Sequence, residues 1–204
     1  VIEKQVLKWC LEIMGMPIDG SGLIVSGTSV ATIIAIKVAR DQKIKNSRKK
    51  GIIQGKLVGY TSEQSHSCIK QAFDVLGLGT DALRVVPCDE NFEIDLKSLR
   101  KMISQDRANG FTPLCVVGTA GAVNVGAIDD LEGIATIAKS EDLWFHVDGA
   151  FGAAGLLGKL ASDRLSGISH ADSLAFDFHK WFQVNYEAGC VLFKSEAAHR
   201  SSFA

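Results

Sequence analysis

The chain has 204 residues, of which 47% are hydrophobic and 22% charged, so it is long enough to bury a sizeable core and too apolar to be disordered. Its 22 lysines and arginines nearly balance 23 aspartates and glutamates, and the formal net charge is −1. This balance excludes a global field that recruits nucleic acid or an anionic membrane. The apolar runs are interrupted before they reach spanning length, and no basic-then-apolar leader opens the chain. We therefore expect a soluble, cytoplasmic protein with no nucleic-acid or membrane partner.

The five cysteines are far apart and contain no Cys-x-x-Cys pair. This pattern favours buried, reduced thiols over disulfides or a zinc site, and we expect no metal. The chain opens at Val1 without a methionine and stops at Ala204 soon after a predicted strand, which suggests a fragment of a longer protein.

Strand and helix patterns alternate along the chain. Periodicity predicts, in order, a helix at 1–14, a strand at 22–25, a helix at 30–42, an exposed basic loop at 43–56, strands at 57–60, 82–86, 114–118, 143–148 and 172–176, and, between these strands, helices at 66–76, 96–106 and 131–139. Short β-branched strands separated by helices indicate an α/β fold with a mostly parallel sheet covered on both faces, here as one domain over 1–204. A last strand at 189–194 follows too closely for a helical crossover and is predicted antiparallel.

A lysine and an aspartate come at the ends of two successive predicted strands. Asp148 ends the strand at 143–148, and Lys180 follows the strand at 172–176. Ligands of parallel sheets bind at the carboxyl ends of strands. A pyridoxal phosphate enzyme needs this pair there, because the lysine can hold the cofactor aldehyde as a Schiff base while the aspartate keeps the pyridine nitrogen protonated.

The turn Ser26-Gly27-Thr28-Ser29 lies between a predicted strand and a long helix. Backbone N–H groups, hydroxyls and the positive end of the helix dipole suit a phosphate there. Taken alone, the turn is better explained by ordinary helix capping by Thr28 or Ser29, but Asp148 and Lys180 downstream favour the phosphate site.

Other polar residues fall at the same predicted edge, each with a plainer alternative. His66 opens a helix and can cap it, Thr119 sits in a Thr-Ala-Gly turn, and His179 can pack under Trp181. His146 shares a strand face with Asp148, which allows a supporting hydrogen bond or a metal pair.

Two further patterns do not carry a function. Gly77-Leu78-Gly79 resembles half of a dinucleotide-binding fingerprint but ends a helix, so that C-capping explains it better. The basic residues in 43–50 have no interleaved aromatics and are typical of a solvated loop.

Four segments together resemble the group II pyridoxal-dependent amino acid decarboxylases, which include the aromatic-amino-acid, histidine, glutamate and diaminobutyrate enzymes. The segments are Tyr60-Thr61-Ser62-Glu63-Gln64-Ser65-His66-Ser67-Cys68, Phe145-His146-Val147-Asp148-Gly149-Ala150, Ala171-Asp172-Ser173 and His179-Lys180-Trp181. They occur in the family's order across nearly the whole chain. The resemblance implies an aspartate-aminotransferase-type large domain (fold type I), of which this chain is the central part, without the N-terminal segment and the C-terminal small domain. It also implies a homodimer.

The resemblance implies roles for nine residues. Lys180 would form the Schiff base, Asp148 would pair with the pyridinium nitrogen, and Ala150 would pack on the ring. His66 would stack on the other ring face and help position the substrate. The remaining residues would hold the phosphate or the ring oxygen: Gly27, Thr28, Ser29, Thr119 and His179.

The chain departs from the family pattern at three positions. Val30 and Thr32 replace an acidic residue and an asparagine that many members carry after the phosphate turn, and Phe178 replaces a proline before His-Lys. These changes concern the phosphate and ring-oxygen contacts and leave the lysine and aspartate intact.

The expected function is decarboxylation of an L-amino acid to an amine and CO2, with pyridoxal 5'-phosphate as cofactor. The alternatives are another enzyme of the same fold, such as an aldehyde synthase, a phosphate-ester lyase or a desulfurase, and a catalytically silent binding or dimerisation module. The sequence does not indicate which amino acid is the substrate.

Overall fold

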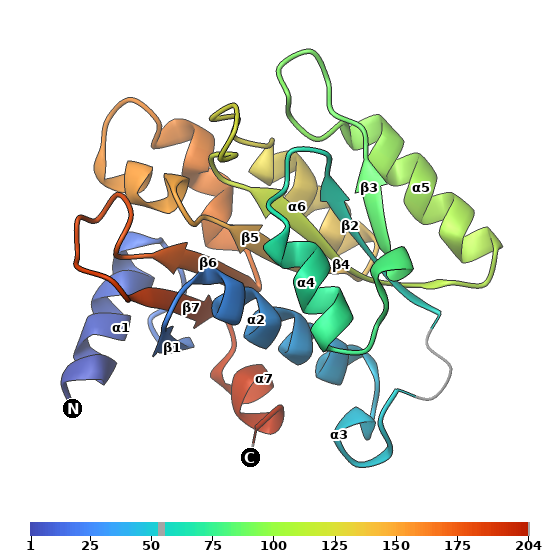
Figure 1. Ribbon diagram of the computed structural model, residues 1–204, viewed down its shortest axis with the longest axis horizontal. Coiled ribbons are helices and arrows are strands. Elements are labelled where there is room, and N and C mark those ends of the chain that lie inside the picture. The colour runs from blue at the N-terminus through green and yellow to red at the C-terminus, as the bar shows by residue number, and fades with distance from the viewer. Residues whose placement is uncertain (53–55, 204) are drawn as a thin grey trace.

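The computed structural model describes residues 1–52 and 56–203. The helices and strands are, in chain order, α1 (Ile2–Ile13), β1 (Ser21–Val25), α2 (Thr28–Lys43), α3 (Ser47–Lys50), β2 (Leu57–Ser62), α4 (Cys68–Val75), β3 (Leu83–Val86), α5 (Leu96–Ala108), β4 (Thr112–Thr119), α6 (Leu131–Ser140), β5 (Trp144–Asp148), β6 (Ser173–Asp177), β7 (Gly189–Phe193) and α7 (Glu196–Ser201) (Figure 1). Short 3-10 helices lie at Thr80–Ala82, Gly152–Leu157 and Asp163–His170.

The strands form one seven-stranded sheet in the order β1-β7-β6-β5-β4-β2-β3. The neighbours from β3 to β6 are parallel, whereas β7 runs antiparallel to both β6 and β1. The predicted mostly parallel sheet and its antiparallel last strand are therefore confirmed. In the ladder register Asp148 lies between Thr119 of β4 and Ala175 of β6.

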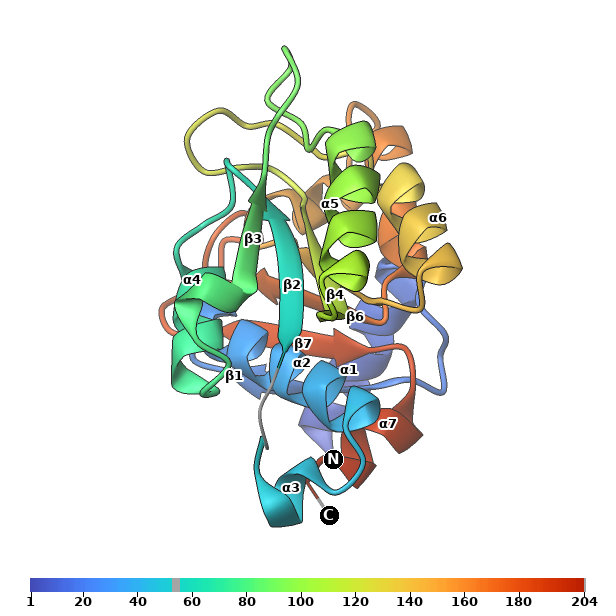
Figure 2. The same ribbon diagram turned by 90° about the vertical axis from the view of Figure 1, so that its right-hand side faces the viewer.

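Helices cover both faces of the sheet. One layer contains α2 and α4, whose buried side chains pack against Cys115, Val117 and Ala175. The other contains α1, α5 and α6, whose buried side chains form one core cluster with Phe145 and Val147. Figure 2 shows α4 on one side of β2 and β3, and α5 and α6 on the other. Because strand side chains alternate between faces, His146 and Asp148 lie on the α2 face.

A glycine in β2 lets α4 lie close to the sheet. A Cβ atom on Gly59 would be 2.4 Å from Cζ of Phe73 and 2.9 Å from Sγ of Cys115. Phe73 is fully buried at this contact. The absence of a side chain at Gly59 therefore determines how far α4, with His66 and Cys68 at its start, stands from the sheet.

The loop predicted at 43–56 is partly wrong. Lys43 still belongs to α2, and a short helix, α3, follows at Ser47–Lys50. Ser47 is buried, and its hydroxyl donates to Oδ1 of Asp41 at 2.7 Å. A single helical turn is too short for hydrophobic periodicity to reveal. Residues 53–55 of this predicted loop lie outside the described residues. Within the described part of the chain, no helix is both long and apolar enough to span a membrane.

Candidate active site

A cavity of about 420 Å³ opens at the carboxyl ends of the parallel strands. All nine residues singled out in the sequence line it: Gly27, Thr28, Ser29, His66, Thr119, Asp148, Ala150, His179 and Lys180. They come from five separate stretches of the chain, and the sheet brings them together.

Asp148 lies at the floor of this cavity and is almost completely buried. Its Oδ1 accepts the N–H of Ala150 at 3.1 Å. Burial raises the pKa of this carboxyl group, while the Ala150 N–H bond and the charge of Lys180 act in the opposite direction. A protonated ring nitrogen beside Asp148 would supply the positive partner that a buried carboxylate requires.

Cys68, at the start of α4, supports Asp148 from the other side. Its Sγ lies 4.0 Å from Oδ2 of Asp148, and both groups are buried. Burial, followed by the charge of Asp148, raises the pKa of the Cys68 thiol to about 12. The thiol therefore stays protonated at neutral pH and can donate its hydrogen to the carboxylate.

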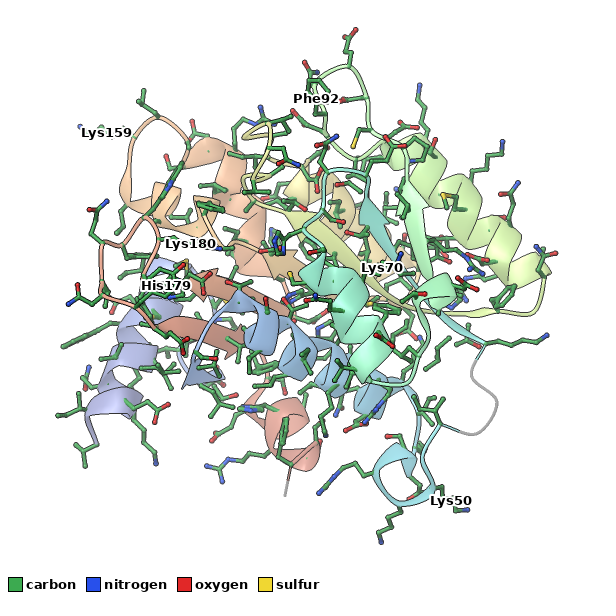
Figure 3. All side chains as sticks on the ribbon, viewed as in Figure 1. Lys50, Lys70, Phe92, Lys159, His179 and Lys180 are labelled. Carbon is green, nitrogen blue, oxygen red and sulfur yellow. The ribbon has the colours of Figure 1, made fainter. Side chains whose placement is uncertain are left out.

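Lys180 follows β6 and enters the same cavity. Its Nζ lies 2.9 Å from Oδ2 of Asp177 and 4.4 Å from the ring centre of Phe151. The lysine side chain is 25% exposed, so that a small molecule can reach the amine. Figure 3 shows Lys180 and His179 beside each other near the loop that joins β6 and β7.

The turn at residues 26–29 runs directly into the first turn of α2. Gly27 is the N-cap residue, with no side-chain cap, and Thr28 begins the helix. The N–H of Thr28 donates to Oδ1 of Asp177 at 2.8 Å. Because neither Thr28 nor Ser29 caps the helix, the capping alternative for this turn is wrong.

Two buried hydroxyls in the cavity have no partner among the described residues: Oγ1 of Thr28 and Oγ1 of Thr119. Unpaired buried hydroxyls are costly, and each can donate to a ligand oxygen. The backbone of Thr119 is held firmly, since its N–H donates to Oδ2 of Asp129 at 2.7 Å. Burial raises the pKa of Asp129 to about 6. These hydroxyls fit a phosphorylated ring with polar substituents.

His66 has the geometry of the predicted helix-capping role. Its Nδ1 accepts the N–H of Cys68 at 3.2 Å, which supports the first turn of α4. The ring is otherwise exposed at the cavity. An imidazole fixed in this way can stack on a ligand ring that enters the cavity.

His179 does not pack under Trp181. Its ring stacks on Tyr186 with centres 4.0 Å apart, and its Nδ1 accepts the N–H of Ala188 at 3.0 Å. Trp181 is 60% exposed and meets Phe151 edge-on. The packing alternative for His179 is therefore wrong.

His146 is completely buried beside the site. Nε1 of Trp144 donates to Oγ of Ser173 at 2.8 Å, and this hydroxyl lies 2.9 Å from Nδ1 of His146. The Ser173 hydrogen can then go to Nδ1, which leaves a hydrogen on Nε2, an atom with no partner in the described chain. Burial lowers the pKa of His146 to about 4, so that the ring is neutral. Within the described residues, no three His, Cys, Asp or Glu side chains are grouped to hold a metal.

Sequence patterns missed four cavity residues with evident contacts: Cys68, Phe151, Asp177 and Tyr186. Of these residues, Asp177 was the easiest to predict, because its carboxylate lies only three residues before Lys180 in the sequence. Its contact with Thr28, 149 positions away, was not.

A larger cavity, of about 890 Å³, lies at the opposite edge of the sheet, where β5 and β6 begin. The ion pair between Lys43 and Asp142 lies at this edge. Neither Lys180 nor Asp148 reaches it, so the smaller cavity is the candidate active site.

The smaller cavity combines an amine for an aldehyde, a buried carboxylate for a ring nitrogen, and hydroxyls at a helix start for a phosphate. This is the donor set of a pyridoxal phosphate enzyme. The model of the pyridoxal-dependent decarboxylase conserved domain matches residues 1–204. The chain belongs to the pyridoxal-dependent decarboxylase family, whose cofactor is pyridoxal phosphate.

The similar proteins include decarboxylases and an aldehyde synthase. The chain is 37% identical to an aromatic-L-amino-acid decarboxylase from Bacillus atrophaeus, over 95% of the chain and 39% of that protein. It is 31% identical to a 3,4-dihydroxyphenylacetaldehyde synthase from Aedes aegypti, over 99% and 41%. The crystal structure of mouse CSAD superposes with a TM-score of 0.94 at 32% identity, over 98% of the chain and 43% of that structure. The chain thus spans about two fifths of the length of these relatives.

Proposed function

We propose that the complete protein carrying this chain decarboxylates an L-amino acid to an amine and CO2, with Lys180 attached to pyridoxal phosphate and Asp148 beside its ring nitrogen. The observation that carries the proposal is the shared cavity. A buried carboxylate from β5, a lysine after β6 and the start of α2 all face one space of about 420 Å³. The family membership supports the reaction type.

Each site residue has a separate role in this proposal. Lys180 provides the amine that binds the aldehyde, and Asp148 holds the proton of the ring nitrogen. Thr28 and Thr119 offer unpaired hydroxyls to the phosphate and to a ring substituent. His66, in this proposal, stacks on the ring and positions the substrate. When bound, the cofactor supplies an electron sink for the electron pair that the departing carboxylate leaves behind.

We also propose that this chain is part of a larger cofactor-binding domain and that the complete protein is a cytoplasmic homodimer. The apolar rim of the cavity supports a covering element. The lining residues Tyr186 and Val123 are 78% and 52% exposed, and Trp181, which meets the lining residue Phe151 edge-on, is 60% exposed. Large apolar side chains gathered at a site entrance are typical of surfaces that another segment or subunit covers.

Borohydride trapping tests the attachment site. Reduction of the complete, cofactor-loaded protein should fix the cofactor on Lys180, and peptide mass spectrometry identifies the modified residue. Lys159 and Lys194 are internal references, because neither lines the cavity. Cofactor found on either of these lysines would contradict the assignment. A Lys180→Arg variant, which keeps the positive charge but cannot form the covalent link, is the matched control.

A panel of L-amino acids tests the reaction. We expect CO2 release and an amine product, with aromatic amino acids tried first because of the relative from Bacillus atrophaeus. Lys180→Arg should abolish both products. Absence of CO2 from the whole panel, in a protein that still binds the cofactor, would favour a silent module over an enzyme.

The specific alternative is an aldehyde synthase, which the Aedes aegypti relative supports. Both reactions release the carboxylate as CO2, so that CO2 alone does not separate them. Product analysis does, because a decarboxylase yields the amine whereas an aldehyde synthase yields the aldehyde. Aldehyde as the main product would replace the proposed function by this alternative.

A further inference from the structure

Asp177 lies between the proposed catalytic lysine and the phosphate turn. It ends β6, is only 3% exposed and directs its two carboxylate oxygens at different elements. Oδ1 accepts the N–H of Thr28 at 2.8 Å, and Oδ2 lies 2.9 Å from Nζ of Lys180. One carboxylate thus joins the first turn of α2 to Lys180.

The first turn of α2 has backbone N–H groups without an acceptor in its own N-cap residue, and Asp177 supplies one. The N-cap residue, Gly27, has no side chain that could accept a hydrogen bond from the helix. The unpaired N–H groups of a helix start favour an anionic acceptor. Asp177 supplies this acceptor from β6, so that the order of the turn depends on a residue outside α2.

The neighbouring strand holds the carboxylate in this position. A Cβ atom on Gly189 of β7 would be 2.8 Å from Oδ1 of Asp177 and 2.5 Å from Cα of Gly27. Only glycine therefore fits where β7 meets the carboxylate and the turn. His179 lies close to the same carboxylate without a hydrogen bond to it: its Nε2 is 3.7 Å from Oδ2 of Asp177, and its Nδ1 accepts the N–H of Ala188.

We propose that Asp177 is a positioning residue that holds Lys180 as an ion-paired ammonium in the cofactor-free site and ties it to the phosphate turn. An amine paired in this way is a poor nucleophile until the pair opens. Entry of the cofactor would then require Lys180 to leave Asp177. The significance of this contact rests on the proposed function, but the contact itself can be measured without turnover.

The test uses Asp177→Asn in the complete, cofactor-free protein. The amide oxygen can still accept the Thr28 N–H, while the amide NH2 group cannot pair with an ammonium. An acylating reagent at fixed neutral pH, followed by peptide mass spectrometry, measures the labelling rate of Lys180 relative to Lys159. Figure 3 shows Lys159 on a separate loop of the molecule. We expect labelling to be roughly fivefold faster in Asp177→Asn, the size of effect for a partly exposed ion pair.

Two other variants separate positioning from general structure. Asp172→Asn changes a carboxylate at the opposite end of β6, which accepts the N–H of Phe145, and should leave Lys180 labelling unchanged. Asp177→Ala loses both contacts, so it should label faster and also bind pyridoxal phosphate more weakly than Asp177→Asn. The melting temperature of each variant reports any general loss of structure.

Lys180 labelling at the parent rate in a folded Asp177→Asn protein would overturn the proposal. Equal acceleration by Asp172→Asn would overturn it too, because the effect would then be an unspecific loosening of β6. Neither result depends on catalysis. Failure of the proposed decarboxylation would appear separately, as absent CO2 release with the ion pair still detectable.

Discussion

At the scale of single residues, Asp148 is the group on which the proposed chemistry depends most. Asp148→Asn keeps the shape of the side chain but removes its charge, so that the ring nitrogen loses its proton and the ring becomes a weak electron sink. We expect cofactor still to attach to Lys180, while CO2 release falls by about a hundredfold or more. Absorbance of the bound cofactor checks its attachment, and CO2 release from the same preparation checks the loss of turnover. Unchanged turnover would show that Asp148 does not face the ring nitrogen.

His146 gives the protein a defined pH response. Its pKa is about 4 in the folded state against 6.5 as the ordinary value. The unfolded chain therefore binds a proton between these two pH values that the folded chain does not. The contribution of His146 to stability is complete above pH 6.5 and is lost as the pH falls towards 4, by up to about 3 kcal/mol.

The free energy of unfolding of the complete protein, measured across this pH range, checks this response. His146→Gln should have a flatter dependence on pH than the parent protein. Taking the difference between the two proteins removes the titration of neighbouring groups, including Asp129, whose raised pKa of about 6 acts with the opposite sign. Parallel curves would show that His146 does not titrate in this way.

At the scale of elements, the packing of α4 on the sheet depends on Gly59. Gly59→Ala would bring a methyl group against Phe73, and we expect a loss of about 2 kcal/mol in the free energy of unfolding. The smaller Phe73→Leu side chain should relieve part of this clash, so that the double variant loses less than the sum of the single variants. Denaturant unfolding of the four proteins gives this coupling.

Gly158→Ala is the matched control for this cycle, since a Cβ atom there meets nothing closer than 3.5 Å. It should change stability by less than about 0.5 kcal/mol. Because α4 begins at Cys68, Gly59→Ala should also weaken cofactor binding. Strict additivity of Gly59→Ala and Phe73→Leu would show that α4 adjusts without strain.

At the scale of the whole molecule, the described chain builds the floor of a site but leaves its rim apolar and exposed. We predict that a protein of residues 1–204 alone does not release CO2 from amino acids with added pyridoxal phosphate, although it can retain much of the sheet. Decarboxylation needs a water-poor, closed site. The exposed apolar surface should also make this protein self-associate. Purification, light scattering and a CO2 assay check both points, and sustained turnover would refute the first.

Local patterns were enough for much of this fold and site. Short apolar runs identified the strands that end near Asp148 and precede Lys180, because a parallel strand covered on both faces is apolar along most of its length. The short link before β7 indicated its antiparallel direction. The elements that these patterns missed, such as α3 and the 3-10 helices after β5, are too short to show a hydrophobic period.

The sequence by itself determined which chemical groups the strand ends carry: a lysine, an aspartate and a hydroxyl-rich turn, each next to a recognisable element. Only the tertiary structure decided how these groups are supported. Cys68 meets Asp148 across 80 positions of the chain, and Asp177 meets Thr28 across 149. Such contacts arise where a helix layer packs on a sheet. Their distances depend on side chains such as Phe73, which belongs to none of the motifs that mark the site. Local sequence patterns do not encode these distances, so the paired state of Lys180 emerged only from the folded chain.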